Sequence, residues 1–178
     1  NSHTEGMNVE ASGRFSHAEG SSTAASGMGA HAEGLSGTAS GDAAHTEGMG
    51  TTAQGAASHA EGSGTRAASR SQHTQGENNI ADTEGSATAR GKYAHIVGNG
   101  TSDAARSNAH TLDWDGNAWF AGDVYVGGTS GTNRDAGSKK LATEEYADTK
   151  APAYTYGTDD LTAGVSALAT GTLYFVYE

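Results

Sequence analysis

The stretch His17-Ala18-Glu19-Gly20 decides the fold, because it returns through the first half of the chain at a fixed interval. A histidine recurs every fourteen residues, followed by Ala or Thr, then Glu or Gln, then Gly; the copies begin at His3, His17, His31, His45, His59 and His73. A looser phrase lies between the copies and is centred on Ala11, Ala25, Ala39, Ala53 and Ala67. Such a period is typical of a solenoid, in which one small unit stacks on the next.

Fourteen residues are too few for a pair of helices but enough for two short strands, each ended by a glycine. Side chains alternate between the faces of a strand. Ser16 and Ala18 are therefore expected to point inward with Ala25, and His17 and Glu19 outward. The inward positions carry almost only Ala, Ser, Thr and Gly. We predict an all-β fold in which residues 1 to about 92 form a narrow parallel β-roll solenoid of two closely spaced sheets.

The two outer faces of this roll differ. The His/Glu face repeats almost unchanged, whereas the opposite face carries an arbitrary column of Glu10, Ala24, Thr38, Thr52 and Arg66. Residues 1–90 contain one Val, one Leu, one Ile and one Phe, and the chain has no Cys, so a single roll buries little apolar surface. We therefore predict a homotrimer around an axis. Its axis ladder would be His3, Glu5, His17, Glu19, His31, Glu33, His45, Glu47, His59, Glu61 and His73.

The run from Ser16 to Gly20, followed by Thr23-Ala24-Ala25-Ser26-Gly27, resembles the head repeats of trimeric autotransporter adhesins. The resemblance covers the first half of the chain and implies a left-handed parallel β-roll that assembles as a trimer. Members of that family carry aliphatic residues where this chain has His and Glu. We therefore expect a polar, hydrogen-bonded trimer axis in place of an apolar one.

Strand spacing predicts that the histidines stack at about 4.8 Å. We favour a structural His–Glu ladder; an ion bound on the axis is an alternative, catalysis is disfavoured, and no cofactor or resident metal is expected. Two pH responses remain open. Pairing with Glu would raise the His pKa and preserve stability until Glu is protonated near about pH 4.3. Burial would instead lower the His pKa, and stability would fall as pH drops through about 6.

The fourteen-residue period is lost after His73. Asp82-Thr83-Glu84-Gly85 repeats the phrase with Asp in the His place, and His95-Ile96-Val97-Gly98 follows with aliphatic residues. We interpret both as irregular terminal coils. The predicted domains are a β-roll over 1–107, a hairpin and strand segment over 108–128, a linker with a short helix over 129–150, and a C-terminal β segment over 151–178.

The segment after the roll contains a hairpin signal. Thr111–Trp114 and Ala118–Ala121 flank Asp115-Gly116-Asn117, which favours a turn between two strands. Asp113, Asp115 and Asn117 also imitate the start of a calcium loop, but the Gly is too early and the twelfth position lacks Glu, so we favour a plain turn. Farther on, Thr143 is expected to cap the short helix, which ends before Pro152.

Three phrases of the second half look like fibre proteins of tailed bacteriophages that infect Gram-positive bacteria. They are Asn108–Trp114 continuing through Gly122–Tyr125, then Lys140–Tyr146, and last the ending from Asp160 through Leu173 to Glu178. This resemblance implies a trimeric fibre on the surface of a virion, in contact with other virion proteins.

Charge and composition narrow the function further. The net charge is −11, with ten acids and four arginines in residues 1–90, which argues against nucleic acid as a partner. No run of eighteen apolar residues exists, so no membrane insertion is expected. Because the chain opens in the middle of a repeat, we expect a fragment or processed form. No Ser–His–Asp set or phosphate loop is recognisable, which indicates a non-enzymatic protein.

The leading hypothesis is a virion fibre that attaches a tailed phage to a glycan or protein of the host cell surface. The alternatives are a head fibre that decorates the capsid, a tailspike depolymerase, and a bacterial surface adhesin. Large aliphatic stacks and paired carboxylates, typical of depolymerases, are not seen in these small-residue coils. Aromatic rings with a polar edge suit saccharides, so the candidate receptor contacts are Trp114, Trp119, Phe120 and Tyr125.

Overall fold

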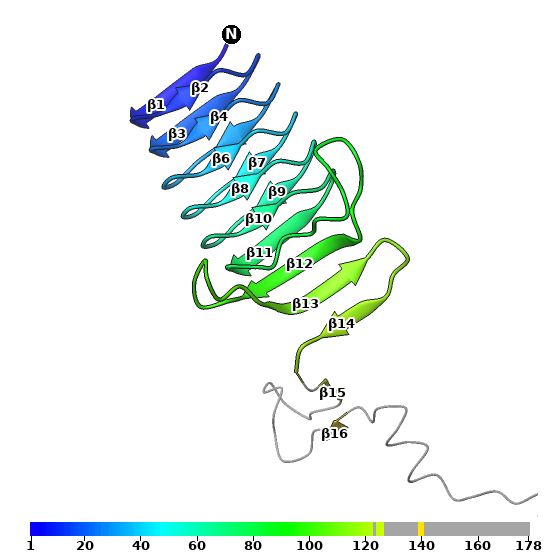
Figure 1. The fold of residues 1–178 in the computed structure, drawn as a ribbon. Coiled ribbons are helices and arrows are strands. Elements are labelled where there is room, and N and C mark those ends of the chain that lie inside the picture. The colour runs from blue at the N-terminus through cyan, green and yellow to red at the C-terminus, as the bar shows by residue number, and fades with distance from the viewer. Residues whose placement is uncertain (123, 127–138, 141–178) are drawn as a thin grey trace, which may run out of the picture. The chain divides into compact units, whose positions relative to one another are not determined.

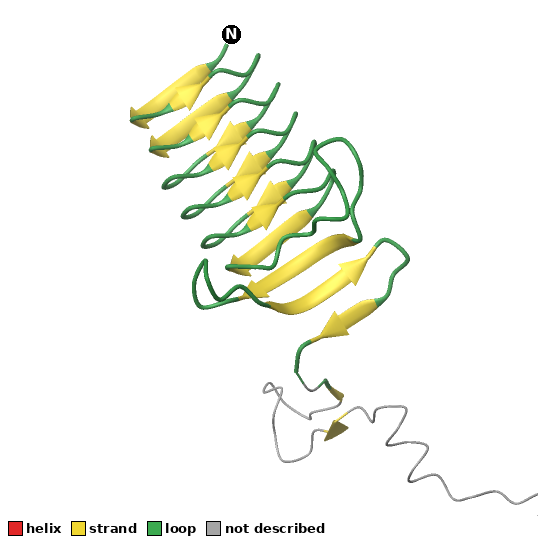
Figure 2. Ribbon diagram, viewed as in Figure 1, coloured by secondary structure: helices red, strands yellow, loops and turns green. Residues whose placement is uncertain are grey.

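The structure, a computed structural model, describes residues 1–122, 124–126 and 139–140 of the chain. All regular structure in these residues is β, and none of them is helical (Figure 2). The chain divides into two compact units, residues 1–122 and 123–178. The predicted helix after Thr143 and the predicted C-terminal β segment lie outside the described residues.

The first unit contains two sheets. Nine strands form one sheet in the order β1 (His3–Met7), β3 (His17–Ser21), β5 (His31–Ala32), β7 (His45–Thr46), β9 (His59–Ala60), β11 (His73–Glu77), β12 (Tyr93–Asn99), β13 (Asn108–Asp113) and β14 (Ala118–Phe120). Five strands form the other, namely β2 (Glu10–Ala11), β4 (Ala24–Ala25), β6 (Thr38–Ala39), β8 (Thr52–Ala53) and β10 (Arg66–Ala67). In the second unit, β15 (Tyr125–Val126) pairs antiparallel with β16 (Lys139–Lys140).

Each strand of a coil pairs in parallel with the equivalent strand of the next coil. His17 aligns with His31 in the larger sheet, and Ala25 aligns with Ala39 in the smaller one. The His17 amide donates to the Ala30 carbonyl at 2.9 Å, and the same bond recurs in the following coils. The stacked coils are seen edge-on in Figure 1. The predicted parallel solenoid with a fourteen-residue period is therefore confirmed.

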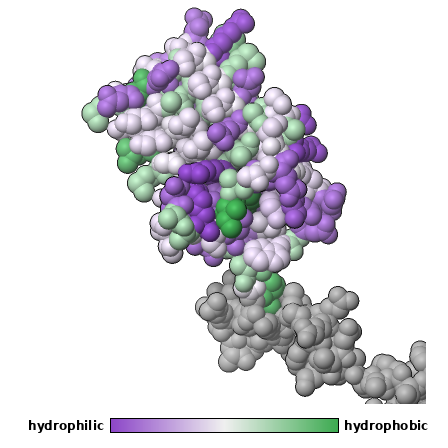
Figure 3. Space-filling view, in the orientation of Figure 1, coloured by the Kyte–Doolittle hydropathy of each residue, from purple (hydrophilic) through white to green (hydrophobic). Residues whose placement is uncertain are grey.

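The core between the two sheets consists of very small side chains. The predicted inward positions Ser16, Ala18 and Ala25 are buried, and the column of buried alanines continues through Ala32, Ala39, Ala53, Ala60 and Ala67. Buried Thr side chains fill most of the remaining space, as at Thr46, Thr51 and Thr65. Methyl and hydroxyl groups leave no room between the sheets for larger residues. On the face drawn in Figure 3, strongly apolar residues form isolated spots rather than one broad patch.

Each coil is built from two similar halves, which the sequence pattern did not reveal. Both halves contain a turn residue with positive φ, such as Ser36 (φ 57°) in one half and Ala43 (φ 52°) in the other. The amides of these residues point back to the preceding coil. The Ser36 amide donates to Ser21 at 2.8 Å and the Ala43 amide donates to Met28 at 2.8 Å. Strand amides bond to the next coil and turn amides to the previous one, so every coil is tied in both directions.

A column of glycines sets how closely the coils approach. Gly34 has a φ of 92°, and a Cβ built on it would overlap the carbonyl oxygen of Gly48 in the next coil. Gly29 has a φ of 66°, but a Cβ there would meet nothing within 4 Å. Ala43 and Ala57 already occupy the position of Gly29 in later coils, with nearly the same φ. Gly34 is therefore required by its neighbour, whereas Gly29 is not.

Replacing Gly34 by Ala should lower the free energy of unfolding by about 3 kcal/mol or more, because φ strain and a backbone overlap add together. Gly29→Ala is the matched control and should stay within about 1 kcal/mol of the parent. Urea unfolding at equilibrium measures both. Equal stabilities of the two variants would mean that the coils can move apart at Gly34 without cost.

The end of the roll differs from the prediction. Residues 82–85 do not form a strand, so they are not a coil of their own. The Asp82 side chain is buried instead, and its carboxylate accepts hydrogen bonds from the amides of Tyr93 at 2.9 Å and Glu84 at 3.0 Å. β12 pairs directly with β11, with His73 aligned to His95. The expected irregular coil is thus one coil enlarged by a folded loop.

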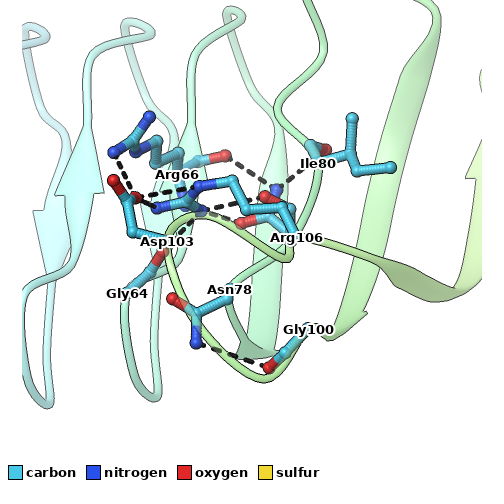
Figure 4. Close-up of polar contacts among 8 residues, drawn as sticks. Gly64, Arg66, Asn78, Ile80, Gly100, Asp103 and Arg106 are labelled. Atoms are coloured by element: carbon cyan, nitrogen blue, oxygen red, sulfur yellow. Dashed lines mark hydrogen bonds and ion pairs between the residues drawn. The ribbon is translucent and has the colours of Figure 1, made fainter.

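Side-chain amides close the end of the five-stranded sheet. The fully buried Asn79 accepts from the Arg66 amide at 2.7 Å and donates to the Arg66 carbonyl at 3.1 Å, so it takes the place of a further strand. Gln72 similarly accepts from the Ala68 amide at 3.0 Å. Arg106 lies over this end, donating to Gly64 and Asn79 carbonyls at 2.8 and 3.0 Å (Figure 4). The Arg106 guanidinium also pairs with the Asp103 carboxylate, which lowers the pKa of Asp103.

Asn79→Ala should lower the free energy of unfolding by about 2 kcal/mol, because the Arg66 amide and carbonyl are left unpaired in a buried position. Gln54→Ala removes an exposed side-chain amide and should change stability by less than about 0.5 kcal/mol. Both variants can be compared by urea unfolding. If Asn79→Ala lowered the free energy of unfolding no more than Gln54→Ala does, water would be replacing the hydrogen bonds of the Asn79 side chain.

The predicted hairpin is present. β13 runs antiparallel to β12, and β14 runs antiparallel to β13. Asp113 orders the turn by accepting from the amides of Asp115 at 3.0 Å and Asn117 at 2.8 Å, and Gly116 has a φ of 90°. These bonds fit the plain hairpin turn that was favoured over a calcium loop. No described strand of the smaller sheet follows β10, so β12, β13 and β14 extend the larger sheet beyond it.

Candidate functional site

The outer face of the nine-stranded sheet carries one continuous stack of aromatic rings. All eight histidines of the chain contribute, and Phe120 ends the stack. Between His17 and His73 the ring centroids are 4.6–4.8 Å apart and the planes are 3–14° from parallel. The predicted spacing of about 4.8 Å is confirmed. We call this surface, with its neighbouring glutamates, the His/Glu face.

Two histidines and the phenylalanine of this stack were not predicted to belong to it. His95 joins because β12 aligns with β11, and its ring lies 5.1 Å from His73. His110 reaches the stack through antiparallel pairing, 5.7 Å from His95, and Phe120 lies 4.5 Å from His110. The phrase His95-Ile96-Val97-Gly98 already gives His95 the place of the earlier histidines. The positions of His110 and Phe120 depend instead on the antiparallel register of β12, β13 and β14, which the period does not predict.

The glutamates of the face lie beside the histidine column. Glu33 Oε1 is 3.4 Å from Nε2 of His45 in the next coil, and Glu61 Oε1 is 3.4 Å from Nε2 of His73. The equivalent contact from Glu47 to His59 measures 3.9 Å. These side chains are about one-third exposed. The structure thus brings the predicted ladder residues together within one chain.

These contacts are electrostatic and do not satisfy the imidazoles. Nε2 is buried without a hydrogen-bond partner in five successive histidines: His17, His31, His45, His59 and His73. The carboxylates approach Nε2 without the geometry of a hydrogen bond. Buried polar atoms are normally paired, so an unpaired atom at every level of a repeating face is exceptional. Nε2 of these five histidines therefore has no hydrogen-bond partner among the described residues.

Burial and mutual repulsion make the inner imidazoles harder to charge. The pKa values of His31, His59 and His95 are lowered, first because burial disfavours the charged ring and then because neighbouring imidazoles repel it. The pKa of Glu47 is also lowered, chiefly by a hydrogen bond with the Glu61 side chain. Of the two pH responses that the sequence left open, these directions favour the one in which burial dominates.

A shallow groove of about 700 Å³ follows the glutamates along the sheet. It is lined by Glu5, Gly6, Glu19, Gly20, Glu33, Gly34, Glu47, Gly48, Glu61, Gly62, Gln75 and Gly76. Directly after three of these glycines stand Met7, Leu35 and Met49, whose side chains are 64%, 46% and 53% exposed. Three of the six coils therefore place an exposed apolar residue directly after the glycine that lines the acidic groove.

Two groups of side chains on this face offer donors suited to a cation. The groups are His45, Glu47 and His59, and Glu19, His31 and Glu33, each with its ligand atoms within 4.8 Å of one another. Imidazole and carboxylate ligands suit zinc and related metals. A single chain therefore brings together side chains that could bind an ion, whereas the sequence prediction placed such an ion on a trimer axis.

The candidate receptor aromatics are on different surfaces. Trp114 is half-buried, and the Arg90 guanidinium lies 4.2 Å from the centre of its ring. Phe120 is 48% exposed, and its ring is tilted by 33° against that of His110 at the His/Glu face. Trp119 is 56% exposed and lines a separate hollow. The Tyr125 side chain lies outside the described residues.

A lowered histidine pKa makes the folded protein less stable as the pH falls. Below about pH 6.5 the unfolded chain binds more protons than the folded one, so stability is greatest above this pH and declines as pH falls. We expect the melting temperature to decline between about pH 7.5 and 5.5. The lowered pKa of Glu47 adds a further loss only below about pH 4.5.

The double variant His31→Gln with His59→Gln should show a shallower decline, because two of the groups that resist protonation are gone. His3→Gln, at the exposed end of the stack, is the control and leaves the inner stack intact. Melting curves recorded at constant ionic strength across this range measure all three proteins. An equally flat profile in the parent and the double variant would contradict the buried state of the column.

In comparisons with known proteins, no family model, no curated protein and no solved structure matched the chain. Among the described residues, no helix is long and apolar enough to cross a membrane. The function must therefore be inferred from the His/Glu face and from the hairpin beside it.

Proposed function

We propose that this chain is a non-enzymatic structural fibre of a tailed phage, assembled as a homotrimer through its His/Glu face, that attaches the virion to a host cell surface. The observation that carries the proposal is the unpaired Nε2 atom on five successive coils of a face that repeats almost without change. A partner for this face must offer polar groups at the same spacing as the coils. Another copy of the chain does so in register.

Assembly would give the unpaired Nε2 atoms of the His/Glu face hydrogen-bond partners. The glutamates are about one-third exposed, so their carboxylates can turn toward the imidazoles of a neighbouring chain. An unpaired buried polar group costs about 1–3 kcal/mol, and the five levels repeat that cost. Reciprocal His–Glu hydrogen bonds around an axis would remove it. The shared axis is supported by the resemblance of the repeat to trimeric adhesin heads.

The apolar border of the groove supports the same assembly. Met7, Leu35 and Met49 are exposed in the single chain, whereas the hydrophobic cluster inside the coils is built from alanines. Burying a Met or Leu side chain contributes about 1.5–3 kcal/mol. Contacts between these side chains and a neighbouring roll would supply apolar burial that one roll lacks.

The placement on a phage rests on the resemblance of the second half of the chain to phage fibres, and a head fibre is the alternative within the virion. A depolymerase is disfavoured because the coils bury small residues in place of the large aliphatic stacks typical of such enzymes.

Light scattering of the intact chain at low micromolar concentration should give three times the 17.9 kDa mass of one chain. The double variant Glu33→Lys with Glu47→Lys places cations among the imidazoles and should reduce the mass to that of one chain. Thr38→Lys with Thr52→Lys changes the opposite face of the same region and should leave the trimer intact. A folded monomer of the parent chain would overturn the proposal.

A further inference from the structure

A second hollow, of about 540 Å³, lies in the first unit where the hairpin extends the larger sheet. It forms because β12, β13 and β14 continue past β10, the last described strand of the smaller sheet, so no strand of that sheet faces them. Its lining includes Ile80, Lys92, Tyr93, Asp113, Asn117 and Trp119. We call it the hairpin pocket. Its volume falls within the range typical of small-ligand sites.

Trp119 gives the hairpin pocket an open aromatic surface. It is paired across the sheet with Thr111, which is almost fully buried and lines the same pocket. Side chains alternate along a strand, so Phe120 points to the opposite face, where it stacks on His110. Trp114 is covered by Arg90. Of the two tryptophans of the chain, Trp119 is therefore the one whose ring remains open to a ligand.

Polar groups stand beside this ring. Asp113 holds the hairpin turn, and its Oδ2 accepts a single hydrogen bond, from the Asn117 side chain at 2.9 Å. That oxygen keeps room for a second donor. The hydrogen bond from Asn117 lowers the Asp113 pKa, so the carboxylate is charged at neutral pH. Exposed Lys92 supplies an ammonium group to the same pocket.

This set of groups selects a chemical class of ligand. One carboxylate and one ammonium balance each other, which disfavours a strongly charged ligand. Together they accept from and donate to neighbouring hydroxyl groups, while an indole face contacts the C–H face of a sugar ring. The groove on the His/Glu face has a different character, since it is lined by acids and glycines and contains no aromatic ring.

We propose that the hairpin pocket binds a neutral hexose unit of a glycan, with the sugar ring stacked on Trp119 and its hydroxyl groups bonded to Asp113 and Lys92. The inference rests on the proposed attachment function and gives it a ligand class and a site. It places receptor contact at the end of the roll, away from the face used for assembly. The hairpin then presents the glycan site while the repeats form the shaft.

The two tryptophans provide a direct test. Trp114→Phe leaves Trp119 as the single tryptophan, and its fluorescence should change on titration with neutral oligosaccharides of glucose, galactose, mannose and N-acetylglucosamine. Trp119→Ala in the parent should weaken the binding of a responding sugar at least tenfold by calorimetry. Trp119→Phe retains a ring and should weaken it less. Phe120→Ala, on the opposite face, should leave affinity unchanged.

The outcomes separate the pocket from the proposed function when mass and host-cell adsorption are measured on the same proteins. No response to any sugar up to about 10 mM would overturn the pocket proposal, as would affinity that is unchanged in Trp119→Ala. Trp119-dependent adsorption without sugar binding would also overturn it, in favour of a protein ligand. Trp119-dependent sugar binding by a protein that is monomeric or does not adsorb would support the pocket and contradict the attachment function.

Discussion

The rest of the structure depends on how closely successive coils approach. Gly34 and Gly48 meet backbone to backbone, and the sheets enclose little more than the methyl and hydroxyl groups of residues such as Ala32 and Thr46. At this spacing the backbone of each coil forms hydrogen bonds to both neighbouring coils. It buries few carbon atoms, however, and hydrophobic stabilisation grows with buried apolar area. The close spacing therefore limits how much hydrophobic stabilisation the core can supply to a single roll.

The same constraint makes the ends of the roll special. A strand at the edge of a sheet exposes unpaired backbone groups, which invite further strands. Asn79 and Gln72 occupy these groups on the smaller sheet with side-chain amides, and no strand in the described part of the chain follows β10 in that sheet. The larger sheet instead continues through an antiparallel hairpin, and β14 is its last strand within the described residues. This unequal ending produces the hairpin pocket, which a solenoid with two sheets of equal length would lack.

The features of the fold that repeat along the chain, or that arise within a few residues, could be predicted from the sequence. The features that depend on pairing between distant segments could not. The inward position of Ala18, the ring spacing and the turn at Gly116 follow from alternation, strand distance and turn chemistry. The buried role of Asp82 and the entry of His110 into the stack could not follow, because long loops set those registers. Alternation along a strand separates Trp119 from Phe120, but only the register of β13 and β14 shows which of the two residues lies on the His/Glu face.

The choice of histidine for the repeating column has a physical reason. Two like charges at the 4.8 Å spacing of the rings repel by about 3 kcal/mol at an effective dielectric constant of 20, so a column of Lys or Arg would oppose its own stacking. A neutral imidazole avoids that repulsion, stacks as a flat ring, and still offers one nitrogen to a carboxylate. Burial first, and then repulsion between neighbouring rings, lowers the pKa of His31 and His59, which favours the neutral form of these two rings. Imidazole therefore allows a polar side chain to repeat at every coil without a column of like charges.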